Sequence, residues 1–308
     1  MPGLFLKEGR EKRMKRLTAV LAALLLCACP ACAVPEGAGT ADYTLPVDFS
    51  PGMPPDPANY VSETVYEDPT IRVEITPDND NGRLFWIADI EIADASQLRT
   101  AAANGFDRRG TEFGHVLARR MNAVVAVDGD YYCYTSDTPL IIRQGVVYRN
   151  KLTKKPGQDV LLIDEDGDFH GIEDAKAGDV GKTVDGKKIV NAFHFGPLLV
   201  NHGQIRTGKI NRHMKPEQRS QRVAIAQTGH LKYRIIVTGP NERGSRALNF
   251  EEWRQFVASM PDIEVAYNLD GGDSAVLVFR NQKVNDPDNE NERPLADIIY
   301  FASALPQP

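Results

Sequence analysis

Apolar and polar residues alternate along much of the chain, and this pattern predicts a protein built mainly from β-strands. Residues 70–76 alternate with a period of two, and a second apolar run covers residues 84–92 after an Asp/Asn/Gly-rich turn at 78–82. Two such runs joined by turn-forming residues are typical of a β-hairpin. The same pattern predicts further hairpins over residues 140–148, 160–172 and 221–238.

Two segments instead have the apolar spacing of a helix. In residues 111–121 the apolar positions fall on one face, with Thr111 as the predicted N-cap, and in residues 249–260 Asn249 and Glu252 have the spacing of a capping box. Residues 94–103 are expected to form a short helix or a loop. We therefore predict an α+β fold with a long, twisted, mixed but mostly antiparallel sheet and helices packed against it.

The N-terminus has the pattern of a secretory signal peptide over residues 1–33. A basic stretch at 12–16 precedes an apolar stretch at 17–26, and Ala31-Cys32-Ala33 has the small residues of a cleavage site. Met14 is an alternative start, and lipoprotein processing at Cys27, Cys29 or Cys32 is the rival interpretation. Either way we expect a secreted or cell-surface protein, and the apolar stretch is too short to predict a stable membrane span.

Residues 34–59 are rich in Pro, Gly and acidic side chains and lack any regular period, so we predict a flexible linker or a loosely docked arm there. Residues 60–308 are expected to form a single domain. The 42 % hydrophobic and 25 % charged fractions are those of a globular protein, and the net charge of -6 argues against a nucleic-acid partner.

The segment 263–279 holds the first group of chemically interesting residues. Two apolar runs flank the sequence Asp270-Gly271-Gly272-Asp273-Ser274, which predicts a strand, a tight polar turn and a second strand. Glycines permit close approach of a ligand to backbone N–H groups, and the turn also carries carboxylates and a hydroxyl. The turn is either part of a reactive site or an ordinary hairpin turn, and the segment by itself does not choose.

Other polar groups also stand at the ends of predicted strands. Asp128-Gly129-Asp130 follows an apolar run, and two neighbouring carboxyl groups at a strand end can have separated pKa values. Arg143 precedes the Gln-Gly turn, where it is either a surface charge or an anion ligand, and Arg222 stands at the start of an apolar run. His194 stands beside Gly196-Pro197, where it is either a general acid or base or a structural histidine.

Five motifs in this order resemble those of the phosphodiester glycosidase family. They lie at residues 127–132, 142–148, 195–200, 222–227 and 269–274, and the resemblance spans roughly residues 70–302, including a final run at 293–301. The chain departs from the family at two positions, because the family usually has Asn where Asp128 stands and often a smaller or different residue where Asp273 stands. Both departures add negative charge near a site that the resemblance implies for phosphate.

The resemblance implies hydrolysis of a sugar-1-phosphodiester of the N-acetylglucosamine-1-phosphate type, releasing free sugar and a phosphomonoester. The substrate expected for an exported member is a cell-wall, capsular or exopolysaccharide phosphoglycan. Such a reaction needs cations for the phosphate and a carboxylate near the sugar carbon. For catalysis we select Asp130 and Asp270, with His194 as a weaker acid/base candidate. For substrate and phosphate binding we select Arg143, Arg222, Arg293, Phe195, Gly196, Asp128, Gly129, Gly271, Gly272, Asp273 and Ser274.

Two other function classes remain open at this point. One is a non-catalytic module that binds phosphoglycans, which the two added aspartates would favour. The other is a metal-dependent phosphodiesterase that cuts the P–O bond, in which the aspartates at 128, 130, 270 and 273 would hold a divalent cation. No cofactor is otherwise predicted.

Overall fold

The computed structural model describes residues 43–135, 138–153, 158–210, 214–240, 246–285 and 292–306. The chain divides into residues 1–42 and a compact unit Tyr43–Pro308. The predicted signal peptide and residues 34–42 of the predicted linker lie outside the described residues. The compact unit begins before the predicted domain start at Tyr60 and so includes the rest of that segment.

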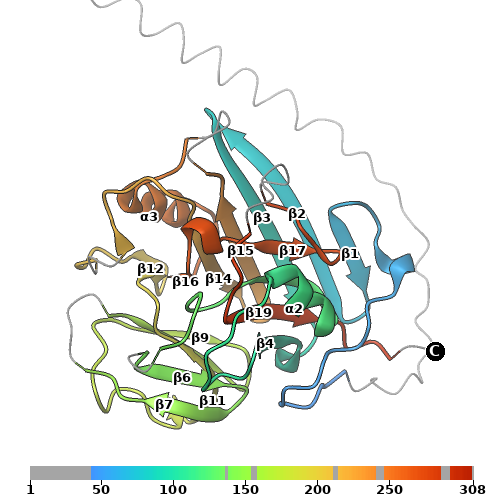
Figure 1. Ribbon diagram of the computed structural model, residues 1–308, viewed down its shortest axis with the longest axis horizontal. Helices are drawn as coiled ribbons and strands as arrows, with labels where there is room; N and C mark the ends of the chain where they lie inside the picture. Colours follow the sequence, from blue (N-terminus) through green and yellow to red (C-terminus); the bar gives the residue numbers. More distant parts are fainter. Residues whose placement is uncertain are drawn as a thin grey trace, which may run out of the picture. The chain divides into compact units, whose positions relative to one another are not determined.

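The described residues of the compact unit form three antiparallel sheets, whereas one long sheet was expected (Figure 1). In spatial order, the eight-stranded sheet comprises β1 (Val65–Asp68), β2 (Ile71–Asp80), β3 (Arg83–Ile92), β15 (Lys232–Thr238), β14 (Val223–Gly229), β16 (Val265–Asn268), β12 (Leu198–Asn201) and β13 (Gln204–Ile205). The six-stranded sheet comprises β7 (Val146–Asn150), β6 (Leu140–Arg143), β11 (Lys187–Phe193), β8 (Val160–Asp164) and β9 (Phe169–Ile172), with β10 (Thr183–Val184) paired to β11. The five-stranded sheet comprises β18 (Gln282–Lys283), β17 (Leu277–Phe279), β5 (Ala123–Asp128), β19 (Asp297–Ala302) and β4 (Leu98–Ala102).

The predicted hairpins are confirmed: β2 pairs with β3, β6 with β7, β8 with β9, and β14 with β15. Turn chemistry explains two of them. Asn81 and Gly82 both have positive φ angles, of 54° and 79°, as do Gln144 and Gly145, at 48° and 75°. Two consecutive positive φ angles match the right-handed twist of the flanking strands.

Two α-helices occur in the described part of the chain, α2 (Gly114–Arg120) and α3 (Phe250–Ala258). The capping box of α3 is confirmed, because Asn249 accepts the Glu252 N–H while Glu252 accepts the Asn249 N–H. The apolar side of α3 lies in one buried cluster with strand residues such as Leu199. The predicted N-cap of the first helix is wrong, because α2 begins after Phe113 and has no side-chain cap.

Residues 94–103 form a single 3₁₀ turn, η2 (Ala95–Gln97), followed by strand β4, so the predicted helix or loop is largely wrong. β4 pairs with β19, and this distant partner gives the segment its extended form. Arg99 on β4 is buried and donates to the backbone carbonyls of Pro46, Asp48 and Ser50. These bonds hold the chain N-terminal to β1 against the five-stranded sheet. Short 3₁₀ turns also occur at η1 (Pro57–Asn59) and η4 (Gly272–Ser274).

The segment 263–279 does not form a hairpin. β16 lies in the eight-stranded sheet between β14 and β12 (Figure 1). β17 lies in the five-stranded sheet between β18 and β5. The Asp270–Ser274 motif therefore crosses from one sheet to the other. No helix among the described residues has the length and apolar character needed to span a bilayer.

Candidate active site

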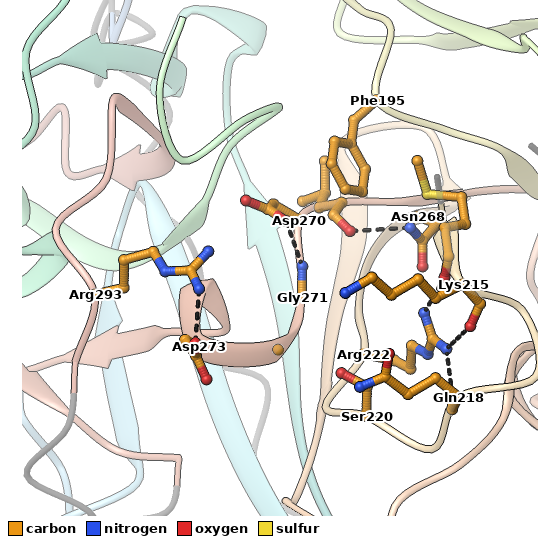
Figure 2. A pocket seen from close by; sticks show the side chains of 13 residues that line it. Phe195, Lys215, Gln218, Ser220, Arg222, Asn268, Asp270, Gly271, Asp273 and Arg293 are labelled. Atoms are coloured by element: carbon orange, nitrogen blue, oxygen red, sulfur yellow. Dashed lines mark hydrogen bonds and ion pairs between the residues drawn. The ribbon is translucent and has the colours of Figure 1, made fainter. Parts of the chain in front are cut away.

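A cavity of about 280 Å³ opens beside the crossing between β16 and β17 (Figure 2). Its walls carry three cationic and two acidic side chains together with glycines, amides and one aromatic ring. The lining residues are Phe195, Met214, Lys215, Gln218, Ser220, Arg222, Asn268, Leu269, Asp270, Gly271, Gly272, Asp273 and Arg293. The cavity has the size of a small-ligand pocket, and its polar wall suits a charged, hydroxylated molecule.

The double glycine brings the crossing segment against the backbone that carries Arg222. A Cβ atom on Gly271 would lie 2.5 Å from the carbonyl oxygen of Gln221, so only glycine fits there. Gly272 has a φ of 61° and donates its N–H to the same carbonyl at 3.0 Å. The two glycines thus fix the spacing between Asp270 and the start of β14.

Asp270 presents a carboxylate with a raised pKa at the centre of the cavity wall. Its oxygens accept the backbone N–H groups of Tyr132, at 2.9 Å, and Gly271, at 3.0 Å. Burial raises the pKa of Asp270 to about 6, and hydrogen bonds from Ser274 and from these two N–H groups oppose that rise. A carboxyl group with such a pKa changes its protonation state in the pH range where acid/base catalysis operates.

Arg222 is a buried cation with no carboxylate partner among the described residues. Its guanidinium donates to the carbonyl oxygens of Met214, at 3.2 Å, and Gln218, at 2.8 Å (Figure 2). Its Nε is buried and has no hydrogen-bond acceptor among the described residues. Burial alone lowers the pKa of Arg222 to about 10. A buried positive charge is costly unless it meets an anion, so the geometry calls for an anionic ligand in the cavity.

Arg293 differs from Arg222 because it is already paired. It contacts the Asp273 carboxylate at 2.6 Å and the Ser274 hydroxyl at 3.4 Å, and its guanidinium stands 4.9 Å from the centre of the Tyr132 ring. Asp273 and Arg293 both line the cavity, and Ser274 lies buried behind them. This cluster is more exposed than Arg222.

Asp130 and Arg143 lie beneath the cavity instead of in its wall. Asp130 is fully buried, and its carboxylate accepts the backbone N–H groups of His194 and Phe195 and contacts Arg143 at 3.3 Å. Arg143 is fully buried as well and also contacts Asp297 at 3.3 Å. Burial raises the pKa of Asp130, while Arg143 opposes that rise. The three charged groups form a buried network that fixes the chain following β11.

His194 and Gly196 belong to this supporting layer, whereas Phe195 reaches the cavity wall. The Nδ1 atom of His194 lies 3.3 Å from the Tyr131 hydroxyl, and the side chain is buried. Gly196 has a φ of 63°, and its carbonyl accepts the side-chain amide of Asn268 at 3.0 Å. The backbone around residues 194–196 thus orients one wall of the cavity.

Asp128 and Gly129 also lie behind the wall. One oxygen of Asp128 accepts the Val276 N–H at 3.2 Å, and the other is buried and has no donor among the described residues. Burial and the negative charge of Asp270 raise the pKa of Asp128 well above its ordinary value. A Cβ atom on Gly129 would lie 2.3 Å from an Asp297 oxygen, so glycine is required beside that carboxyl group.

Sequence reasoning did not select Lys215, Gln218, Asn268 or Asp297 as site residues. The first three line the cavity, and Asp297 completes the buried network with Arg143. The sequence contained a feature that could have identified Asp297, because it is a lone carboxylate at the start of an apolar strand. Lys215 and Gln218 lie in a polar segment without periodicity, and nothing local in the sequence distinguishes them.

A metal site was one of the open alternatives. Within the part of the chain that the structure describes, no three His, Cys, Asp or Glu side chains are grouped to hold a metal ion. The oxygens of Asp130 and Asp270 accept from backbone N–H groups, and Asp273 pairs with Arg293. Asp128 keeps one buried oxygen without a donor among the described residues. Most of these carboxylate oxygens are already used by N–H groups or by a guanidinium. They do not fit a hard cation, which requires several free oxygens.

A solved structure of another protein shares this architecture. The chain resembles the zebrafish N-acetylglucosamine-1-phosphodiester alpha-N-acetylglucosaminidase catalytic domain, auto-inhibited by its pro-peptide, with a TM-score of 0.55, 17 % identity, and coverage of 82 % of this chain and 87 % of that one. A hypothetical protein from Synechocystis matches with a TM-score of 0.49 at 15 % identity, covering 78 % of this chain and 64 % of that one. A search of curated proteins finds no match.

The family comparison covers the residues that build the cavity and the network beneath it. The phosphodiester glycosidase profile matches residues 121–302, more than half of the chain. That span begins before β5 and ends with β19, so it includes Asp128, Arg222 and Asp270. The chain therefore belongs to the phosphodiester glycosidase family.

Proposed function

We propose that the protein hydrolyses a sugar-1-phosphodiester at its glycosidic C–O bond, releasing free sugar and a phosphomonoester. The observation that carries this proposal is Arg222, a buried guanidinium that has no carboxylate partner among the described residues and lines the same cavity as Asp270. A phosphate group supplies the missing anion. A guanidinium also holds phosphate in a directed, bidentate way that an ammonium group cannot match.

The chemistry follows from the charges around the cavity. The bond between C1 and the phosphate oxygen breaks, and its electron pair leaves with the phosphate, where Arg222 and Lys215 stabilise the developing charge. A water molecule forms the new bond to C1 and gives its proton to the ionised Asp270. The phosphomonoester is a good leaving group, so holding its charge contributes more than protonating it. Asp270 also stabilises positive charge at C1.

The supporting residues act through the wall that they fix. Asp130 and Arg143, both selected from the sequence for direct roles, are fully buried and do not line the cavity. We propose that they position the cavity wall, because Asp130 accepts the backbone N–H groups of His194 and Phe195 and so holds the backbone that carries the Phe195 side chain. His194 is assigned the same role, since its ring contacts Tyr131 and is absent from the cavity wall.

The proposal includes export and a polymeric substrate. The basic stretch at 12–16 and the apolar stretch at 17–26 support secretion or cell-surface attachment. An exported enzyme of this class meets phosphodiester-linked sugars in cell-wall, capsular or exopolysaccharide material. Mass spectrometry of the mature N-terminus, on protein from the culture medium and from the membrane fraction, tests export. A protein that stays inside the cell and still carries residues 1–33 would contradict it.

Replacing Arg222 with Ala tests the proposal directly. We expect kcat/KM on a nitrophenyl-type N-acetylglucosamine-1-phosphodiester to fall by at least about 100-fold, because the developing phosphate charge loses its buried cation. The matched control is Arg280→Ala. Arg222 stands over the ring of Phe250 and Arg280 stands over that of Tyr60, but Arg280 is paired with Glu63 and lies outside the cavity wall.

The identity of the product separates this function from its alternatives. Free sugar and a phosphomonoester support the proposal, whereas a sugar phosphate would indicate P–O cleavage. Binding of the phosphodiester without any product would indicate a binding module. Near-normal turnover in the Arg222→Ala variant would show that Arg222 has no role in the reaction.

A further inference from the structure

The charged side chains along the cavity wall are not equivalent. Among the described residues that line it, the cations are Lys215, Arg222 and Arg293, and the acids are Asp270 and Asp273. If all five are ionised, the wall carries one net positive charge. Arg222 has no carboxylate partner in the part of the chain that the structure describes, whereas Arg293 is held by Asp273 at 2.6 Å.

The Arg293–Asp273 pair stands apart from Arg222. In Figure 2, Asp270 and Gly271 lie between the pair and Arg222. The backbone N–H of Arg293 also donates to the Asp273 carbonyl at 3.3 Å, and the Tyr132 ring supports the guanidinium from one side. Arg293 is therefore held in a fixed place with its charge compensated.

We propose that Asp273 is a selectivity residue, which masks Arg293 so that the cavity favours a singly charged phosphodiester over a doubly charged phosphomonoester. The inference rests on the proposed function and adds the charge class of the preferred ligand. A phosphodiester carries one negative charge, and a phosphomonoester carries between one and two near neutral pH because its second ionisation falls there.

Masking Arg293 also favours turnover. The proposed reaction converts a singly charged group into a more highly charged product in the same cavity. A wall with an unmasked Arg293 would hold that product more tightly, and slow release limits many hydrolytic cycles. Asp273 keeps the free positive charge near Arg222 and Lys215, where the leaving group develops its charge.

Asp273 can be changed without disturbing the fold. Its side chain is 79 % exposed, and an ion pair at such a site contributes little to stability. Asp273→Asn keeps the size of the side chain and removes its charge. Asp262→Asn is the matched control, because Asp262 is exposed and lies outside the cavity wall. At its φ of 63° asparagine is well tolerated.

The experiment measures binding by titration calorimetry at fixed ionic strength, with inorganic phosphate and dimethyl phosphate as probes. We expect Asp273→Asn to bind phosphate about three- to tenfold more tightly than the wild type, with a smaller gain for dimethyl phosphate, because the unmasked Arg293 acts on the larger charge. Asp262→Asn should behave as the wild type. Adding Arg293→Met to Asp273→Asn should abolish the gain.

The outcomes separate this inference from the proposed function. If the wild type binds phosphate through Arg222 but Asp273→Asn leaves the ratio of the two affinities unchanged, the selectivity role is overturned and the proposed function stands. A gain that persists in the double variant with Arg293→Met also overturns it. If the wild type fails to bind either probe, or Arg222→Ala binds phosphate normally, both conclusions fall.

Discussion

The Asp270 carboxyl group titrates within the pH range in which hydrolases are assayed. Burial raises its pKa to about 6, so it is protonated below that pH and ionised above it. As the proposed base it must be ionised, and we expect kcat/KM to rise about tenfold per pH unit below pH 6 and to level off above it. A pH–rate profile of the wild type measures this, and Asp270→Asn should lower kcat/KM at least about 100-fold. A profile that is flat through pH 6 would contradict the assignment.

Asp128 should make stability depend on pH. Burial and the neighbouring Asp270 raise its pKa well above the unfolded value, so the folded state binds its proton more tightly than the unfolded state does. Its stabilising contribution is complete below the unfolded pKa and is lost as pH rises, by at most about 1.4 kcal/mol per pH unit. Asp128→Asn cannot ionise and should gain in stability relative to the wild type as pH rises. Urea unfolding at several pH values measures this, and a constant difference between the two proteins would refute it.

Individual site residues were predictable where they stand in a strand-end motif. Arg222, Asp270 and the double glycine were selected from the sequence, and all of them line the cavity. Lys215 was not selected, because it lies in an irregular segment whose path is set by the strands around it. The sequence also could not show that Arg143 is paired with carboxylates while Arg222 lines the cavity. The partners of Arg143 are brought to it by the tertiary fold.

At the scale of the element, the crossing segment depends on Gly271. Gly271→Ala would place a Cβ atom 2.5 Å from the Gln221 carbonyl, so either the crossing segment or the start of β14 must move. We expect a loss of about 1–3 kcal/mol in the free energy of unfolding and a larger relative loss of kcat/KM, because Asp270 and Arg222 would move apart. Thermal melts and kinetics measure both. Gly181→Ala is the control, since a Cβ atom there meets nothing closer than 3.6 Å; equal effects of the two substitutions would contradict the role of Gly271.

Elements with local signals were predicted well. The β2–β3 and β6–β7 hairpins are set by turn residues that accept positive φ, and the α3 capping box is set by Asn249 and Glu252. β4 was missed because its extended form comes from pairing with β19, a strand near the C-terminal end of the described residues. The pattern around Asp270 correctly indicated two strands and left an ordinary hairpin turn as one of two interpretations, whereas β16 and β17 join separate sheets.

At the scale of the whole molecule, the division into three sheets was not predictable from alternation alone. Alternation tells which face of a strand is buried but not which strand lies beside it. The path of the chain before β1 was not predictable from the sequence either. It is set by long-range hydrogen bonds from the buried Arg99 on β4 to the carbonyls of Pro46, Asp48 and Ser50. The mostly antiparallel, sheet-rich character of the fold was therefore accessible from the sequence, whereas the sheet order that creates the cavity was not.

The buried network of Arg143, Asp130 and Asp297 joins two of these sheets. Arg143 ends β6 in the six-stranded sheet, while Asp297 begins β19 in the five-stranded sheet and Asp130 follows β5. Removing Arg143 would leave two buried carboxyl groups without their cation, and breaking a buried ion pair in this way costs about 3–5 kcal/mol. Asp297, whose pKa burial raises to about 6, would take up a proton more readily and recover part of that loss at low pH.

Arg143→Ala and Arg222→Ala should consequently fail in different ways. Arg143→Ala should lower the free energy of unfolding by about 3–5 kcal/mol near neutral pH. Arg222→Ala should cost about 1 kcal/mol, because among the described residues Arg222 donates hydrogen bonds only to backbone carbonyls, yet it should lose most of the activity. Urea unfolding and kcat/KM on the same two preparations provide the comparison. Equal losses of stability in the two variants would contradict the distinction between Arg143, which joins two sheets, and Arg222, which is proposed to bind the ligand.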